Sequence, residues 1–241
     1  VVYSADSNSN TVVGTWSAEP SGSYTRYRWG TKIDAVHGSS RALTIQNNTV
    51  NIAINDIWFY DPLNDCVLVQ YNPGGVALNR CRFENTASSN VYALLRAATK
   101  STLTLNQCSF IPTAKNGYSI SAFDNAAVFV AGCYFANTSY ASGNILCQRG
   151  SEIHMQQGSS ILHSGPQGVG VSAVTGGRII FAGVSANGYE GIAGCTTGIS
   201  TATGGQATGT ANNIYSGNTS DEVGDPVITG TLAAVEDTSG V

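Results

Sequence analysis

The sequence predicts an all-β chain folded as a right-handed parallel β-helix of about six to seven rungs. Three observations predict this class: an eight-residue phrase recurs along the chain, apolar residues alternate within it, and turn residues separate the strand-length runs. The copies are IAINDIWF from Ile52, VALNRCRF from Val76, LTLNQCSF from Leu103, VFVAGCYF from Val128, IHMQQGSS from Ile153 and IIFAGVSA from Ile179. Self-similarity at this spacing indicates stacked units, none of which can bury its apolar face alone.

The spacing inside each copy predicts how the unit is built. The sixth residues of the copies are Ile57, Cys81, Cys108, Cys133, Gly158 and Val184, at steps of 24, 27, 25, 25 and 26 residues. We use this sixth residue as the landmark of each copy. Apolar residues stand five and three positions before the landmark, at the landmark itself, and often two positions after it. Positions two apart share one face of a strand, so the odd step of three predicts a corner between two short strands. In the fifth copy, Gly158 and Ser160 predict that only the first strand is kept.

A third apolar run precedes each copy and predicts a third strand in each rung. These runs are Ala42–Ile45, Val67–Val69, Tyr92–Leu95, Ile120–Phe123, Ile145–Cys147 and Val171–Val174. Three short strands in a period of about 25 residues fit a parallel β-helix. Helical repeats need longer units with a helical apolar stripe, and the leucine-rich repeat phrase is missing, so both alternatives fit worse.

The remaining segments divide the chain into three parts. Residues 1–40 are rich in Ser, Asn and Gly and include four large aromatic residues, which predicts an N-terminal cap or connector. Residues 41–215 are predicted to form the parallel β-helix. Residues 216–241 are predicted to form a C-terminal strand or extension, because apolar runs there are short and the last residues are polar.

The six cysteines are predicted to be free core thiols. Cys81, Cys108 and Cys133 occupy the same position of successive copies, so they should stack as one interior column. Side chains that run side by side in a parallel ladder match the torsion of a disulfide poorly. Cys66, Cys147 and Cys195 lie elsewhere on the rung and are also expected to pack in the core.

Composition and motifs exclude several functions. The net charge is −4 and Lys and Arg are scattered, which argues against a nucleic-acid-binding role. No apolar run is long enough to span a membrane. No Cys/His spacing proposes zinc, no acidic cluster proposes calcium, and no glycine-rich loop leads into a helix. We therefore expect no cofactor and no metal.

Function is expected on residues that point away from the column near the landmark. These residues are Asp56, Trp58, Tyr60, Arg80, Arg82, Glu84, Gln107, Ser109 and Tyr134. Aromatic rings stack on sugars, and guanidinium, carboxylate and amide groups bond to hydroxyls or anionic substituents. The predicted glycan-binding residues are Trp58, Tyr60, Arg80, Arg82, Gln107 and Tyr134. An ordinary solvated surface or a subunit contact is the alternative interpretation.

A hydrolase interpretation needs two carboxylates about 5–9.5 Å apart across the bond to be cleaved. Asp56 and Glu84 lie on neighbouring rungs and are the predicted catalytic pair. Asp61 with Glu84, and Asp124 with Glu152, are rival pairs. No local motif favours any of them.

The column of strands, the low charge and three interior phrases resemble the β-helical tailspike and tail-fibre proteins of bacteriophages. The phrases are Cys81-Arg82-Phe83, Cys108-Ser109-Phe110 and Cys133-Tyr134-Phe135, and the resemblance covers about residues 36–213. It implies a homotrimer in the phage tail that binds bacterial surface polysaccharide outside the cell, beside other tail proteins of the virion. The first hypothesis is therefore a tail adhesin. A polysaccharide depolymerase and a structural virion protein without enzymatic activity are the alternatives.

Overall fold

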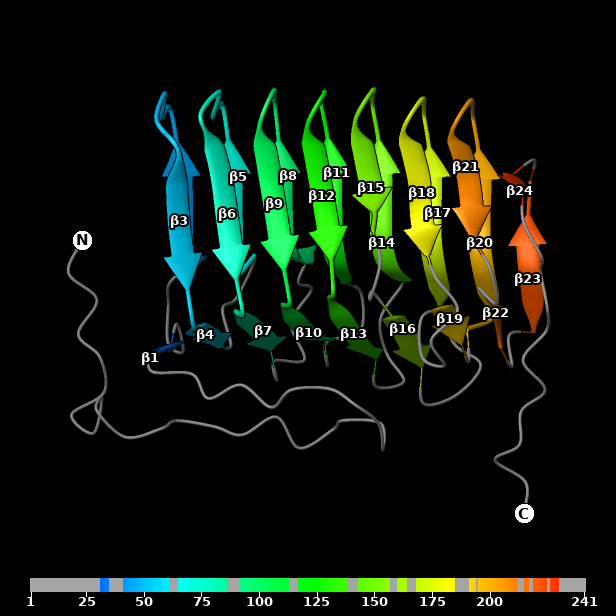
Figure 1. Ribbon diagram of the computed structural model, residues 1–241, viewed down its shortest axis with the longest axis horizontal. Coiled ribbons are helices and arrows are strands. Elements are labelled where there is room, and N and C mark those ends of the chain that lie inside the picture. The colour runs from blue at the N-terminus through cyan, green and yellow to red at the C-terminus, as the bar shows by residue number, and fades with distance from the viewer. Residues whose placement is uncertain are drawn as a thin grey trace, which may run out of the picture.

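The computed structural model is a solenoid of β-strands without an α-helix in the part that it describes. The described residues are 31–34, 41–60, 65–85, 92–112, 117–137, 143–156, 160–163, 168–184, 191–193, 195–211, 215–216, 219–224 and 226–229. Their strands form three parallel sheets of eight strands each, which we name sheets I, II and III. Figure 1 shows the rungs side by side along the long axis, with sheet III in front, sheet II behind it and the short strands of sheet I below.

The strands of sheet I are β1 Thr31–Asp34, β4 Ile57–Tyr60, β7 Arg82–Asn85, β10 Ser109–Pro112, β13 Tyr134–Asn137, β16 Ser160–His163, β19 Gly191–Ala193 and β22 Tyr215–Ser216. Those of sheet II are β2 Leu43–Gln46, β5 Val67–Gln70, β8 Ala93–Ala98, β11 Tyr118–Phe123, β14 Gly143–Gln148, β17 Val169–Val174, β20 Thr197–Ala202 and β23 Ser220–Val223. Those of sheet III are β3 Ile52–Asn55, β6 Gly75–Asn79, β9 Thr102–Asn106, β12 Ala127–Ala131, β15 Glu152–Met155, β18 Arg178–Val184, β21 Gln206–Ala211 and β24 Val227–Thr229.

This topology confirms the prediction of an all-β parallel solenoid. The chain passes from sheet II to sheet III to sheet I and back, and every strand pairs with the strand three places along the chain. Each sheet contains eight strands, slightly more than the six to seven rungs predicted. The difference arises at the ends, where β1 pairs with β4 and β22, β23 and β24 continue the three sheets without any copy of the repeated phrase. Apart from β1, the predicted cap lies outside the described residues.

The fifth copy of the phrase corrects one expectation. The sequence predicts that this copy loses its second strand, but β16 is present and pairs with both β13 and β19. Ile161 is the partner of Phe135 in the register, one position later than the strict spacing from Gly158 would place it. A corner that is one residue longer therefore hides the strand from a search at fixed period, because a slip of one residue exchanges the two faces.

The core is a narrow column that the inward residues of the three sheets fill. On sheet I, the rings of Phe59, Phe83, Phe110 and Phe135 stack in register, with centroid distances of 5.2, 4.7 and 4.9 Å between successive rings. All four side chains are fully buried. The apolar residues at alternate positions in sheets II and III complete the column, which explains the spacing by two within each phrase.

The cysteines confirm the prediction of free core thiols. All six are buried and none forms a disulfide. Cys81, Cys108 and Cys133 occur on successive rungs, and the Cys108 thiol donates to the carbonyl of Leu78 at 3.2 Å. A hydrogen bond with Cys108 and then burial raise the pKa of Cys81, whereas burial is the main cause of the raised pKa of Cys108. The thiols of Cys81 and Cys108 are therefore protonated packing groups.

Two kinds of corner give each rung its shape. Between sheets III and I, a single left-handed residue makes the bend, and Asp56, Arg80, Gln107 and Gly132 occupy it with φ of 59°, 53°, 55° and 60°. Between sheets II and III, a single left-handed residue makes the turn after β2 and β5, at Asn47 and Tyr71, whereas two consecutive ones make it after β8, at Thr99 and Lys100. Two positive φ values in a row are typical of a type I′ turn. The odd step of three in each phrase is thus the single-residue corner.

Candidate functional site

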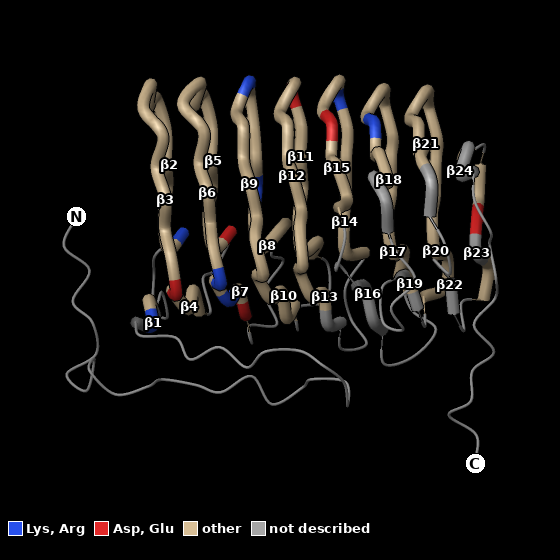
Figure 2. Tube along the Cα trace, viewed as in Figure 1, with Lys and Arg blue, Asp and Glu red and all other residues tan. Residues whose placement is uncertain are grey.

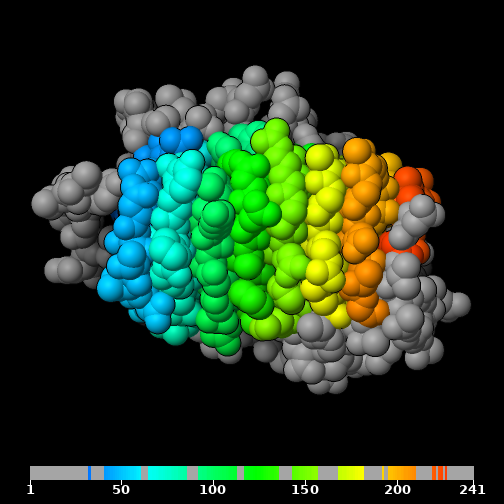
Figure 3. All heavy atoms as spheres, turned by 90° about the horizontal axis from the view of Figure 1, so that it is seen from above, coloured from blue at the N-terminus to red at the C-terminus, as the bar shows by residue number. Residues whose placement is uncertain are grey.

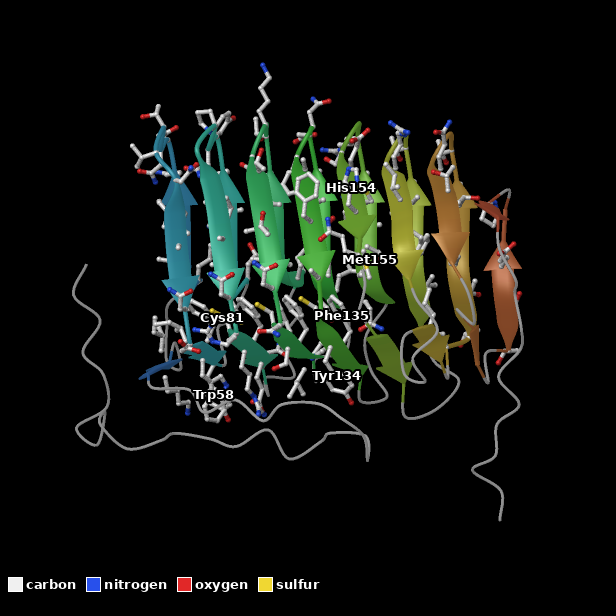
Figure 4. All side chains as sticks on the ribbon, viewed as in Figure 1. Trp58, Cys81, Tyr134, Phe135, His154 and Met155 are labelled. Atoms are coloured by element: carbon white, nitrogen blue, oxygen red, sulfur yellow. The ribbon has the colours of Figure 1, made fainter. Side chains whose placement is uncertain are left out.

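The candidate site begins with Trp58 and Tyr60, which β4 presents on the outer side of sheet I. The two residues are two positions apart, so they share one face of the strand, and Phe59 between them points into the core. Their rings meet edge to face, with centroids 5.4 Å apart. In Figure 4, Trp58 and Tyr134 extend below sheet I, whereas Cys81 and Phe135 lie within the column.

Two cations accompany these rings because the parallel register brings them there. Trp58 stands between Lys32 of β1 and Arg82 of β7. The Lys32 ammonium lies 3.6 Å from the Tyr60 ring centroid and 5.1 Å from that of Trp58, and the Arg82 guanidinium lies 4.8 Å from the Trp58 centroid. Cations over aromatic faces stabilise both partners and orient the rings. Lys32, Trp58, Tyr60 and Arg82 form one surface unit, the Trp58 cluster.

The outer side of sheet I becomes less exposed beyond β4. Arg82 and Glu84 form an ion pair at 2.6 Å, and their side chains are 11% and 15% exposed. Tyr134, two rungs from Arg82, is only 6% exposed, and Ser109 between them is buried. Alternation along a strand predicts which side of the sheet a residue faces, but it does not predict what lies over that side. Among the predicted aromatic residues of sheet I, Trp58 and Tyr60 are half-buried and Tyr134 is buried, so the accessible aromatic surface there is at the Trp58 cluster.

Three predicted residues lie at the corner and not on the face of sheet I. Asp56, Arg80 and Gln107 occupy the left-handed position of successive rungs. Both oxygens of Asp56 accept hydrogen bonds from Arg80, Nε to Oδ1 and Nη2 to Oδ2, each at 2.7 Å. Gln107 is exposed on the next rung. Figure 2 shows charged residues concentrated at this corner and at the opposite turns.

The carboxylates of the predicted catalytic pair are thus held by different arginines in different places. Asp56 is at the corner with Arg80, and Glu84 is on the outer side of sheet I with Arg82. Of the rival pairs, Asp61 lies outside the described residues. Asp124 and Glu152 lie near the opposite turns, where Asp124 pairs with Arg149 at 3.7 Å and Glu152 with Arg178 at 2.5 Å.

Metal and membrane features were also sought in the described part of the chain. No group of three or more His, Cys, Asp and Glu residues there could hold a metal ion. His154 stacks on Phe129 with centroids 4.7 Å apart, and its Nε2 lies 3.5 Å from Glu152. The same described residues include no helix with the length and apolar character that a membrane span requires.

Sequence reasoning missed two polar arrangements. The first is an asparagine ladder on the outer side of sheet III, in which Asn79 donates to Asn55 at 2.7 Å and Asn106 donates to Asn79 at 2.8 Å. Its signal was visible, since an Asn stands two positions before the landmark in three successive copies. The second surrounds Asp65, which is completely buried and pairs with Arg41 and Arg96. No local motif marks it, because its members come from three rungs.

Comparisons of the chain with protein-family models, with curated proteins and with solved structures find no significant match. Its fold and side-chain geometry therefore carry the functional argument.

Proposed function

We propose that the chain is a receptor-binding module of a bacteriophage tail, which adheres to bacterial surface polysaccharide through the Trp58 cluster. The observation that carries the proposal is the pair of outward aromatic rings fixed by cations from both neighbouring rungs. Rings of this kind stack on the apolar faces of sugars, and the adjoining charged groups bond to hydroxyls. The virion tail, outside the cell, is the proposed location.

Several features make this surface suitable for adhesion. A parallel solenoid is a rigid support, because every strand is hydrogen-bonded to its neighbours along the column. Trp58 and Tyr60 lie on a strand and not on a loop, so binding a sugar would cost little ordering of the backbone. Both rings are only half-buried.

We further propose that three copies assemble side by side. The outward residues of β3, β6, β9 and β12 are uncharged, including the asparagine ladder, and Figure 2 shows the middle of these strands free of Lys, Arg, Asp and Glu. Packing long flat sheets against copies of themselves buries such faces. Light scattering should give a mass of three times the 25.0 kDa chain. A monomer at micromolar concentration would refute the trimer and leave glycan binding untouched.

Adhesion is proposed ahead of cleavage for a geometric reason. Both oxygens of Asp56 are occupied by Arg80, and Glu84 is paired with Arg82 and mostly buried. A depolymerase needs one carboxyl group free to donate a proton and a second to act as base or nucleophile. Release of reducing ends from polysaccharide, lost in both Asp56→Asn and Glu84→Gln, would replace adhesion with depolymerisation.

The test of adhesion uses purified capsular and O-antigen polysaccharides from a panel of bacterial strains. Trp58→Ala should weaken binding of the polysaccharide that the native chain retains by about tenfold or more, because one stacking ring is lost. Tyr71→Ala is the matched control, since it removes an aromatic side chain that is 55% exposed and follows β5, away from sheet I and from the proposed interface. Equal binding by the native chain and both variants would remove the Trp58 cluster from consideration, and no retained polysaccharide at all would favour a structural virion role.

A further inference from the structure

The two arginines in and beside the Trp58 cluster are already bound to carboxylates of the protein. Arg82 places its Nε 2.8 Å and its Nη2 2.6 Å from Oε2 of Glu84. These two nitrogens form one edge of the guanidinium, and arginine binds carboxylates through the paired donors of such an edge. Glu84 thus occupies the edge with which Arg82 would otherwise bind an acidic group of a ligand.

Little else of Arg82 is available to a ligand. Its guanidinium carbon lies 4.8 Å from the ring centroid of Trp58, so the ring covers one face of the guanidinium. Only 11% of the Arg82 side chain and 15% of the Glu84 side chain are exposed. An anionic ligand that displaced Glu84 would leave a mostly buried carboxylate without its cation, which is strongly unfavourable. Arg82 is therefore placed to orient Trp58 and not to bind an anion.

The other nearby cations are engaged in the same way. Nε and Nη2 of Arg80, at the adjoining corner, bind the two oxygens of Asp56 at 2.7 Å each, so this guanidinium edge is closed as well. The Lys32 ammonium lies over the rings, 3.6 Å from the Tyr60 centroid and 5.1 Å from the Trp58 centroid. Each of the three cations thus has an anionic or aromatic partner within the protein.

We infer that the Trp58 cluster binds a neutral sugar, and that polysaccharides rich in uronate or phosphate are poor ligands. The inference rests on the adhesion function proposed above and specifies the class of its ligand. Trp58 and Tyr60 supply the surface on which the C–H groups of a sugar ring stack. A negative group on the ligand would approach Glu84, the partner of Tyr60 in the register, and would be repelled by it.

The test compares a neutral and an acidic form of one polymer, with binding to the full chain measured by biolayer interferometry. The polysaccharide that the native chain retains is oxidised at its primary hydroxyls to carboxylates or, where it is acidic, its carboxylates are reduced to hydroxyls. We expect the retained polymer to be neutral and its oxidation to weaken binding by about tenfold or more. Between about 20 mM and about 500 mM salt, the affinity for the neutral form should change by less than about threefold, because salt screens only interactions between charges.

The outcomes separate this inference from the proposal of adhesion. An acidic polymer that is retained, that depends on Trp58 and that is released when its carboxylates are reduced would overturn the inference and leave adhesion through the Trp58 cluster in place. A neutral polymer that Trp58→Ala retains as well as the native chain does would overturn both. The same holds if no polysaccharide of the panel is retained.

A single variant tests the role of the carboxylate directly. Glu84→Gln removes the charge that occupies Arg82 and keeps the shape of the side chain, so it should bind the oxidised polymer about tenfold more tightly than the native chain does. A merely structural role of Glu84 would weaken the binding of both forms alike, and no gain for the oxidised form would contradict the inference. If Glu84→Gln does not fold, the comparison of the two polymer forms on the native chain decides alone.

Glu152→Gln is the matched control, because it also releases an arginine, Arg178, from an ion pair. This pair lies at the start of β15 and β18, beside the turns that Figure 3 shows from above, on the side of the column opposite sheet I. The control should bind both polymer forms as the native chain does. An equal gain for the oxidised form in the two variants would show a general effect of net charge and would overturn the inference.

Discussion

Two regions of the column are packed by opposite means. From β4 to β13, large side chains fill the interior, and four phenylalanine rings stack one above the other. At β21 small residues take the inward positions: Ala207 and Gly209 are the partners of the larger Ile179 and Phe181 of β18 in the register. A Cβ on Gly209 would lie 2.1 Å from the Phe181 carbonyl oxygen. A rung can thus be filled by bulky side chains or by closely approaching backbones. Removing side-chain atoms should destabilise the first kind of rung, and adding them should destabilise the second.

The largest expected effect is a cavity in the region packed by phenylalanine. Phe110→Ala removes a ring that stacks on both neighbours, and we expect a loss of about 3–5 kcal/mol in the free energy of unfolding. Urea denaturation followed by circular dichroism measures it. Phe129→Ala on the outer side of sheet III is the control and should cost much less, because Phe129 is only half-buried. Similar losses in the two variants would contradict the account of the core.

Thiol reactivity compares how well water is excluded on the rung next to the phenylalanine-packed region, where Cys147 lies, and near the glycine-packed region, where Cys195 lies. Burial raises the pKa of Cys147 in β14 to about 12, and that of Cys195 near β20 to about 12. Relative to the ordinary value of 9.0, the thiolate fraction near pH 8 falls roughly a thousandfold, and so should the rate of alkylation. Mass spectrometry after iodoacetamide treatment should find both thiols unmodified in the folded chain and modified in guanidinium chloride.

The same shifts predict a pH dependence of stability. A thiol whose pKa is raised on folding stabilises the fold fully below its unfolded value, and this contribution is lost as the pH rises toward the folded value. The denaturant concentration at the midpoint of unfolding should therefore decrease as the pH rises from about 9 to about 12.

In the alkylation experiment, faster modification of Cys195 than of Cys147 would show that the glycine-packed region opens more often.

The next effect is overpacking of the glycine-packed region. Gly209 combines a φ of 140° with the close approach to Phe181, so Gly209→Ala should cost about 1–3 kcal/mol. Gly204→Ala is the matched control: its φ is 75°, but no atom lies within 4 Å of the added Cβ. The control should cost only about 1 kcal/mol, from backbone conformation alone. A reversed order of the two melting temperatures would refute the packing argument.

The smallest effect concerns the asparagine ladder. Asn79 both donates and accepts along the ladder, so Asn79→Ala should cost about 1 kcal/mol, whereas Asn55→Ala at the end removes a single bond and should cost less. Chemical denaturation of the two variants checks the difference. Identical midpoints would mean that water replaces these exposed bonds without loss.

The sequence predicted the architecture better than it predicted the site, and the reason is physical. Inward positions obey a period that stacking imposes, so the strands, the phenylalanine column and the free cysteines could be read from the repeat. The second strand of the fifth copy was missed because the corner before Ile161 is one residue longer than the repeat predicts. Outward positions obey no such period. The burial of Tyr134 and the meeting of Asp65 with Arg96 depend on contacts between rungs that no local pattern encodes.

The single-residue corner between sheets III and I has a consequence for how such a chain can change. Asp56, Arg80, Gln107 and Gly132 differ in charge, size and polarity, yet all adopt the same left-handed backbone and the first three donate the same hydrogen bond to the next rung. The path of the chain there is set by the stacked backbones and is indifferent to the side chain. Substitutions at this corner can therefore alter the charge and shape of the outer edge of the molecule one rung at a time, while the scaffold stays unchanged.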